Sequence, residues 1–298
     1  MRFAPALLLA AGTAAVGCSS GGEPHGSPVL LGVYWITGAQ PTLVWNGADG
    51  GVVTAPPAAQ EVDFVFDRLL DGSRVENTIM ENGIQVPMSK AMPPITVSWP
   101  DFATAMSAPP FSDQVFYNSE PFPLSGGATA YVLLQPTLPG FPSNDTITFT
   151  LDKTGLTSAY GDQMTGPSQI SVMTAPLSVS FRLPSGEAAV PSNYMLPIVF
   201  SNRVAGASAI APFVTVTAGG AALPVSFAAS AADQTVIDVA PPSCLGEWPA
   251  GTPISVTVAT GAPDAFGGPL AAAASATFTS IGGPSPDAGC PSADGGTD

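Results

Sequence analysis

Short stretches in which apolar and polar residues alternate recur from about residue 28 to residue 281. Examples are "TITFTL" at 146–151, "QISVMT" at 169–174 and "ISVTV" at 254–258. Because successive side chains of a strand point to opposite faces, this period predicts half-buried β-strands. Turn residues separate the stretches at short intervals, which favours antiparallel sandwiches over a parallel sheet with crossover helices. The pattern therefore predicts an all-β fold.

The strand pattern also occurs twice. Residues 135–174 match residues 240–279 in the spacing of their strands and turns, and Tyr160 of the first stretch corresponds to Phe266 of the second. Matched intervals over this length indicate a repeated structural unit. We therefore expect two tandem domains.

The expected domains are residues 28–175 and residues 176–281. They meet near Ala175-Pro176 with almost no linker, and a short proline joint permits little rotation. The pair should therefore form a stiff rod.

The first copy is longer than the second, and the extra chain is predicted around 88–125. Long loops inside compact domains are often functional, and aromatic side chains anchor many interfaces and sugar sites. We therefore treat the aromatic residues of this insert as candidates for binding an envelope polysaccharide or a surface protein. The alternative is that they cover the core of an enlarged domain. The candidates are Trp99, Phe102, Phe111, Phe116, Tyr117 and Phe122.

The start of the chain, residues 1–17, has the pattern of an export signal. One basic residue, Arg2, precedes an apolar stretch that is shorter than the roughly 20 residues needed to span a bilayer. The residues Ala15-Val16-Gly17-Cys18 resemble the lipobox of bacterial lipoproteins. The resemblance implies acyl chains on Cys18, a membrane partner and an outer-membrane location; the alternative is an ordinary cleaved signal with an incidental cysteine. Residues 18–27 would then form a short polar tether.

The repeated unit resembles the bacterial Ig-like domain of the SbsA type. In that family a strand that ends in phenylalanine precedes a turn with an aspartate, as Phe66 precedes Asp71 here. An aspartate turn and a phenylalanine in the last strand follow later, and Asp264 and Phe278 occupy these positions in the second copy. Ser158 stands in the first copy where the second has Asp264. The resemblance implies two Ig-like antiparallel β-sandwiches with a structural, adhesive or scaffolding role and no catalysis.

Composition narrows the functional classes further. The formal net charge is −15, and this field repels nucleic acid, so we expect no nucleic-acid partner. The only histidine, His25, lies in the predicted tether, which leaves a serine triad without a base. Acidic turn residues such as Asp162 and Asp264 are expected to cap turns and not to bind calcium. We expect no metal, no cofactor and no enzyme; a glycoside hydrolase with paired carboxylates is a remote alternative.

Two cysteines remain after Cys18, and they are Cys244 and Cys290. An exported chain meets an oxidising compartment, so we expect a disulfide between them; the alternative is that Cys290 pairs with another molecule. The bond would fasten the acidic tail, residues 282–298, to the second domain. The low complexity of that tail predicts disorder.

Overall fold

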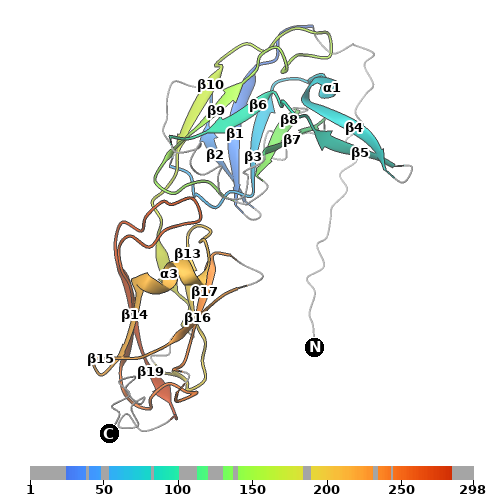
Figure 1. Ribbon diagram of the computed structural model, residues 1–298. Helices are drawn as coiled ribbons and strands as arrows, with labels where there is room; N and C mark the ends of the chain where they lie inside the picture. Colours follow the sequence, from blue (N-terminus) through green and yellow to red (C-terminus); the bar gives the residue numbers. More distant parts are fainter. Residues whose placement is uncertain are drawn as a thin grey trace, which may run out of the picture.

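The computed structural model describes residues 25–37, 40–47, 54–81, 84–100, 113–119, 130–136, 140–183, 189–230, 234–242 and 244–283 of the 298-residue chain. The predicted export signal and most of the predicted tether and tail lie outside the described residues, as do Cys18, Cys290, Phe102, Phe111 and Phe122. Figure 1 shows the described strands gathered into two bodies that follow one another end to end.

The first body is a sandwich of two antiparallel sheets. One sheet has five strands in the order β2-β1-β3-β8-β7, and the other has three in the order β10-β9-β6. The strand bounds are β1 Leu30–Thr37, β2 Gln40–Trp45, β3 Glu61–Phe66, β6 Ile95–Ser98, β7 Asp113–Asn118, β8 Tyr131–Pro136, β9 Thr146–Leu151 and β10 Gln169–Met173. Between β3 and β6 lie a single helical turn, α1 (Gly72–Val75), and a separate hairpin, β4 (Glu76–Glu81) with β5 (Ile84–Ser89).

The second body is also a sandwich. Its sheets have the orders β11-β13-β17-β16 and β12-β19-β18-β14-β15, and every pairing is antiparallel except that of β12 with β19. The strand bounds are β11 Val179–Phe181, β12 Ala189–Pro191, β13 Leu196–Phe200, β14 Val214–Ala218, β15 Ala221–Ala222, β16 Ser226–Ala229, β17 Val236–Ala240, β18 Ile254–Val258 and β19 Ala274–Ile281. A short helical stretch, α3 (Ala207–Ile210) with the 3-10 turn η1 (Ala211–Phe213), precedes β14.

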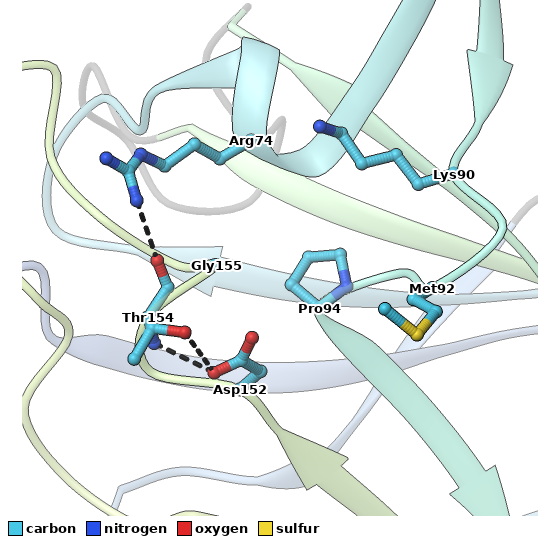
Figure 2. Close-up of a pocket in the computed structure, with 7 residues that line it drawn as sticks. All are labelled: Arg74, Lys90, Met92, Pro94, Asp152, Thr154 and Gly155. Atoms are coloured by element: carbon cyan, nitrogen blue, oxygen red, sulfur yellow. Dashed lines mark hydrogen bonds between the residues drawn. The ribbon is translucent and has the colours of Figure 1, made fainter.

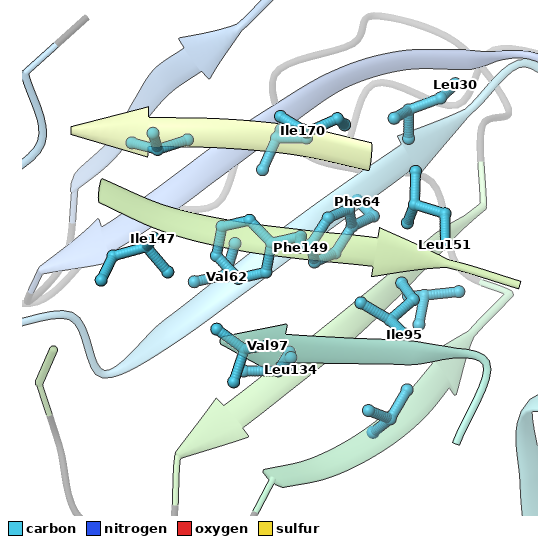
Figure 3. Close-up of a cluster of buried hydrophobic side chains, with 14 of the residues drawn as sticks. Leu30, Val62, Phe64, Ile95, Val97, Leu134, Ile147, Phe149, Leu151 and Ile170 are labelled. Carbon is cyan, nitrogen blue, oxygen red and sulfur yellow. The ribbon is translucent and has the colours of Figure 1, made fainter. Parts of the chain in front are cut away.

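Alternation along the strands builds each core. In β9 the apolar positions Ile147 and Phe149 point inward, and the intervening threonines are less buried. Figure 3 shows Phe149 beside Phe64 of the opposite sheet, and their ring centroids lie 5.3 Å apart with the rings edge to face. In the second core Trp248 and Phe278 pack in the same way at 5.4 Å. Burying one such side chain contributes roughly 1.5–3 kcal/mol, so these clusters hold the sheets together.

The predicted all-β fold is confirmed, and the predicted repeat is visible in the strand order. β3, β8, β9 and β10 of the first sandwich correspond to β13, β17, β18 and β19 of the second. One core draws on residues 30–172 and the other on residues 177–278. Within the described part of the chain, no helix has the length and apolarity needed to cross a bilayer.

The extra chain of the first sandwich is not one insert. β6 and β7 fall inside the predicted insert, yet they pair with β9 and β8 as β14 and β16 pair with β18 and β17. Part of the extra length is the hairpin of β4 and β5, which begins at Glu76, before residue 88. The interval between matched residues measures added length but cannot place it, so the structure corrects the expected position.

Candidate functional site

The two sandwiches meet in a buried polar contact, which we call the junction. The side-chain amide of Asn202 donates to the Phe141 carbonyl at 2.8 Å and to Asp264 Oδ2 at 2.9 Å. Asp264 Oδ2 also accepts from the backbone N–H of Ser143 at 2.8 Å. Asn202 is 0% exposed and Asp264 2% exposed, so water does not compete for these bonds. The junction therefore joins two turns of the second sandwich to one loop of the first.

The turn that carries Asp264 orients its carboxylate toward the first sandwich. Oδ1 accepts from the backbone N–H groups of Phe266 at 2.9 Å and Gly268 at 2.7 Å, which leaves Oδ2 to the junction. Gly268 is required by close approach, because a Cβ there would lie 2.8 Å from Asp264 Oδ2 and 3.0 Å from the Ser143 carbonyl oxygen. Turn capping by Asp264 thus also positions the group that bonds across the junction.

Aromatic side chains surround this polar contact. Phe266 of the second sandwich packs against the first core, with its ring centroid 6.0 Å from that of Trp99. Trp99 also contacts Phe141, at 6.5 Å between centroids. Gly140, with φ +115°, brings the backbone against Asn202, whose Oδ1 would lie 2.8 Å from a Cβ at that position. Apolar contact and hydrogen bonds therefore act on the same small interface.

The joint between the sandwiches is itself held by backbone hydrogen bonds. Ala175 donates its N–H to the Ala55 carbonyl at 2.7 Å and accepts from the Asn144 N–H at 3.0 Å. On the other side, Ser178 donates its N–H to Ser201 Oγ at 2.9 Å. Both ends of the proline-containing joint are thus fixed to a sandwich.

In the first sandwich, the turn that corresponds to the Asp264 turn contains Ser158 and Asp162, and it contacts His25 and Gly26, which precede the first strand. Ser158 Oγ accepts from the N–H groups of Tyr160 and Asp162, each at 3.2 Å, as Asp264 Oδ1 accepts from Phe266 and Gly268. Asp162 Oδ2 accepts from the Gly26 N–H at 3.2 Å, and the His25 ring lies 3.9 Å from the Tyr160 ring between centroids. Each sandwich therefore uses the same turn to hold the chain before it, and we call this turn the clasp.

The predicted aromatic binding candidates divide into separate places. Trp99 is 5% exposed in the first core, so it is not accessible to a partner in this structure. Tyr117 packs against the same core, and its hydroxyl oxygen accepts from the Leu70 N–H at 3.1 Å. Phe116, which precedes Tyr117 in β7, is half-buried. Trp99 and Tyr117 therefore fit the alternative that the aromatic residues cover the core. Phe102, Phe111 and Phe122 lie outside the described residues.

Cys244 is disulfide-bonded. The predicted partner, Cys290, lies outside the described residues, so the pairing of these two cysteines stays a prediction.

Asp63, one of several acidic residues close together in the first copy, has a carboxyl group whose burial the sequence did not predict. Asp63 pairs with Tyr34 of β1 and Leu133 of β8, is 3% exposed, and has no hydrogen-bond partner for Oδ1. Burial first, and then the charge and hydrogen bond of Glu61, raise the pKa of Asp63 to about 8. Its place at an outward position of an alternating strand gave no signal of burial. Within the described residues, no group of three or more histidine, cysteine or acidic side chains is suited to hold a metal.

No family model and no curated protein matches the chain. Among solved structures, it is similar to titin Ig tandem domains at 11% identity and a TM-score of 0.25, over 76% of this chain and 89% of that chain. It is also similar to the N-terminal part of the bacterial S-layer protein SbsC at 7% identity and a TM-score of 0.24, over 86% of this chain and 44% of that chain.

Proposed function

We propose that this protein is a structural or scaffolding component of the bacterial cell envelope. Acyl chains on Cys18 hold it to the membrane, and two stiffly joined β-sandwiches extend from that anchor. The proposal assigns no catalysis to the chain.

The junction is the observation that carries the proposal. A hinge motion between the sandwiches would break the bond from Asn202 to the Phe141 carbonyl and the bond from the Ser143 N–H to Asp264 Oδ2, and it would expose the contact of Phe266 with the first core. The bond to the Asp264 carboxylate is charge-assisted and contributes roughly 1.5–3 kcal/mol, and the buried aromatic contact adds to it. The joined arrangement is therefore favoured over a bent or loose one, as a spacer requires.

The clasp of the first sandwich supports the same function at the other end. Because the first sandwich holds His25 and Gly26, only residues 19–24 separate the predicted anchor at Cys18 from the held segment. A short tether limits how far the rod can tilt and move from the membrane surface.

Small-angle X-ray scattering of the full chain carrying Cys18→Ser tests this function. We expect a single elongated particle whose maximum dimension does not change with salt. Asn202→Ala should make the scattering that of a flexible pair, because the amide that bridges Phe141 and Asp264 is lost.

Asp162→Ala is the matched control. It alters the corresponding turn of the first sandwich, where the side chain reaches Gly26 and not the second sandwich. Flexible scattering from the unsubstituted rod, or equal flexibility in both variants, would contradict a stiff spacer.

A further inference from the structure

One face of the hairpin formed by β4 and β5 is mostly apolar and exposed. Directly opposed residues of two paired strands lie on the same face, so the register assigns each side chain to a face. The three pairs on this face, which we call the hairpin face, are Asn77 with Met88, Ile79 with Val86, and Glu81 with Ile84. Four of these six side chains are apolar, and three of the four are exposed, namely Ile79, Ile84 and Met88.

The opposite face of the hairpin is turned toward the sandwich. Glu76 Oε2 accepts from the backbone N–H of Tyr117 in β7 at 2.9 Å. Ser89, which opposes Glu76 in the register, accepts through Oγ from the Val115 N–H at 3.0 Å. Because successive side chains of a strand alternate between faces, the neighbouring positions of the hairpin face point away from β7. The hairpin face is therefore turned outward.

The hairpin has no counterpart in the second sandwich. The chain between β13 and β14, residues 201–213, contains only α3 and η1 as regular elements. A sandwich of this kind consequently forms without such a hairpin, and Figure 1 shows β4 and β5 projecting from the side of the first body. Exposed apolar patches on folded domains mark sites of interaction with proteins or membranes, so the hairpin face is a candidate interaction surface.

The base of the hairpin lies beside the clasp of the first sandwich. Asp71, the residue before α1, donates its N–H to the carbonyl of Thr157 at 2.8 Å, next to Ser158 of the clasp. Figure 2 shows a second link, from the Arg74 guanidinium to the Thr154 carbonyl at 3.1 Å. Because β4 follows α1 directly, the hairpin begins close to the turn that holds the tether.

This position brings the hairpin within reach of a membrane, a step that rests on the proposed acylation of Cys18. Only residues 19–24 separate Cys18 from His25 in the clasp, and a fully extended chain of this length spans at most about 25 Å. Each strand of the hairpin has six residues and is therefore about 20 Å long. The anchor and the hairpin face can thus contact one membrane surface together.

The size and charge of the surface favour a lipid bilayer over a second copy of the chain. A stable interface between proteins uses about 20–30 residues on each side, whereas the hairpin face has six. Two copies with a formal net charge of −15 each also repel one another. A bilayer requires no complementary protein surface, and two further exposed methionines, Met80 and Met92, add to the apolar area of this region.

The hairpin can enter only the headgroup layer of the bilayer. Within the described residues, β4 and β5 pair only with each other, so each strand has one edge of unpaired backbone groups. These groups and the Glu81 carboxylate need water, which the hydrocarbon core lacks and the interfacial layer supplies. Glu81 and the net charge of the chain also disfavour anionic headgroups, so the expected surface is zwitterionic.

From these observations we infer that the hairpin face docks on the surface of a zwitterionic lipid bilayer. Ile79, Ile84 and Met88 enter the headgroup layer, and Glu81 stays at its hydrated level. The contact is a second attachment beside the anchor, and it fixes which side of the rod faces the membrane.

Co-sedimentation of the full chain carrying Cys18→Ser with phosphatidylcholine vesicles tests this contact. Without Cys18 no acyl chain is present, so the result does not depend on whether the natural chain is acylated. We expect binding that added salt does not weaken, and weaker binding when phosphatidylglycerol is mixed into the vesicles. Ile84→Gln should lower the partition coefficient about tenfold, because a large apolar side chain no longer enters the headgroup layer.

Ile281→Gln is the matched control. Ile281 in β19 of the second sandwich is 64% exposed, close to the 67% of Ile84, but it lies outside the hairpin. This variant should bind vesicles as the Cys18→Ser chain does, and thermal unfolding verifies that both variants are folded.

Three results would each overturn the inference. The first is a chain that does not sediment with phosphatidylcholine vesicles, and the second is an equal loss of binding in the two isoleucine variants. The third is a dimer in analytical ultracentrifugation that Ile84→Gln dissociates, because a second copy would then cover the hairpin face.

Discussion

At the scale of single residues, Asp63 makes stability depend on pH in an unusual direction. Its native-state pKa of about 8 lies well above the ordinary pKa of an aspartate because of burial and the neighbouring Glu61. The native state therefore keeps a proton that the unfolded chain releases, so stability is lost as pH rises from about 4 through 8. The stabilisation by the protonated Asp63 carboxyl group is fully present below about pH 4.

Asp63→Asn should remove this loss. The amide carries no charge, so we expect the variant to be more stable than the unsubstituted chain by about 2–4 kcal/mol at pH 9 and little changed at pH 4. Urea unfolding at the two pH values measures the difference. A variant that is less stable at pH 9 would show that Asp63 is ionised in the native state without penalty.

Asp67 supplies a control of opposite sign. Burial alone would raise its pKa, but hydrogen bonds from Arg68 and from the Val29 N–H outweigh burial and lower it. Its contribution to stability is therefore present at neutral pH and lost as pH falls through the lowered pKa. Asp67→Asn should weaken the protein at pH 7 by the same unfolding measurement, where Asp63→Asn strengthens it.

At the scale of elements, the hairpin of β4 and β5 is separable from the sandwich. Its two strands pair only with each other, and most of their side chains are exposed. Its base is different, because Glu76 Oε2 accepts from the Tyr117 N–H and Ser89 Oγ accepts from the Val115 N–H, at 2.9 and 3.0 Å. The base thus bonds the edge strand β7.

Replacing residues 78–87 with Asn-Gly should leave the first sandwich folded. The new turn closes the Asn77–Met88 pair and keeps both bonds to β7, so we expect a change of less than about 1 kcal/mol in the free energy of unfolding. Thermal unfolding measures this, with deletion of residues 113–118 as the comparison. That deletion removes β7 with the buried Val115, and should cost several times more.

Sequence patterns predicted the elements better than their contacts. Alternation in β9 and β18 indicated which side chains face each core, because period and burial agree there. The same alternation failed at Asp63, whose outward position is buried by neighbours that the period does not describe. The match of Ser158 with Asp264 located the clasp, but its bonds to Asn202 and Gly26 depend on chain that is distant in sequence.

At the scale of the whole molecule, the proposed acylation of Cys18 can be tested by phase partition. If Cys18 carries acyl chains, the full chain should partition into detergent in a Triton X-114 phase separation, and Cys18→Ser should move it to the aqueous phase. Several acyl chains bind a membrane far more firmly than one, because each buried methylene contributes about 0.8 kcal/mol. Aqueous partition of the unsubstituted chain would mean that the signal is removed without lipid attachment.

The clasp also favours one end of the chain for the addition of a further sandwich. Each sandwich carries the turn that grips what comes before it, through Ser158 and Asp162 in one and Asp264 in the other. A further copy added at the carboxyl end would therefore carry its own clasp, and this turn would need only a loop of the second sandwich to which it can hydrogen-bond. A copy added in front would have to displace His25 and Gly26 from the turn that they now contact, so the fold accommodates a further sandwich more easily at the carboxyl end than at the amino end.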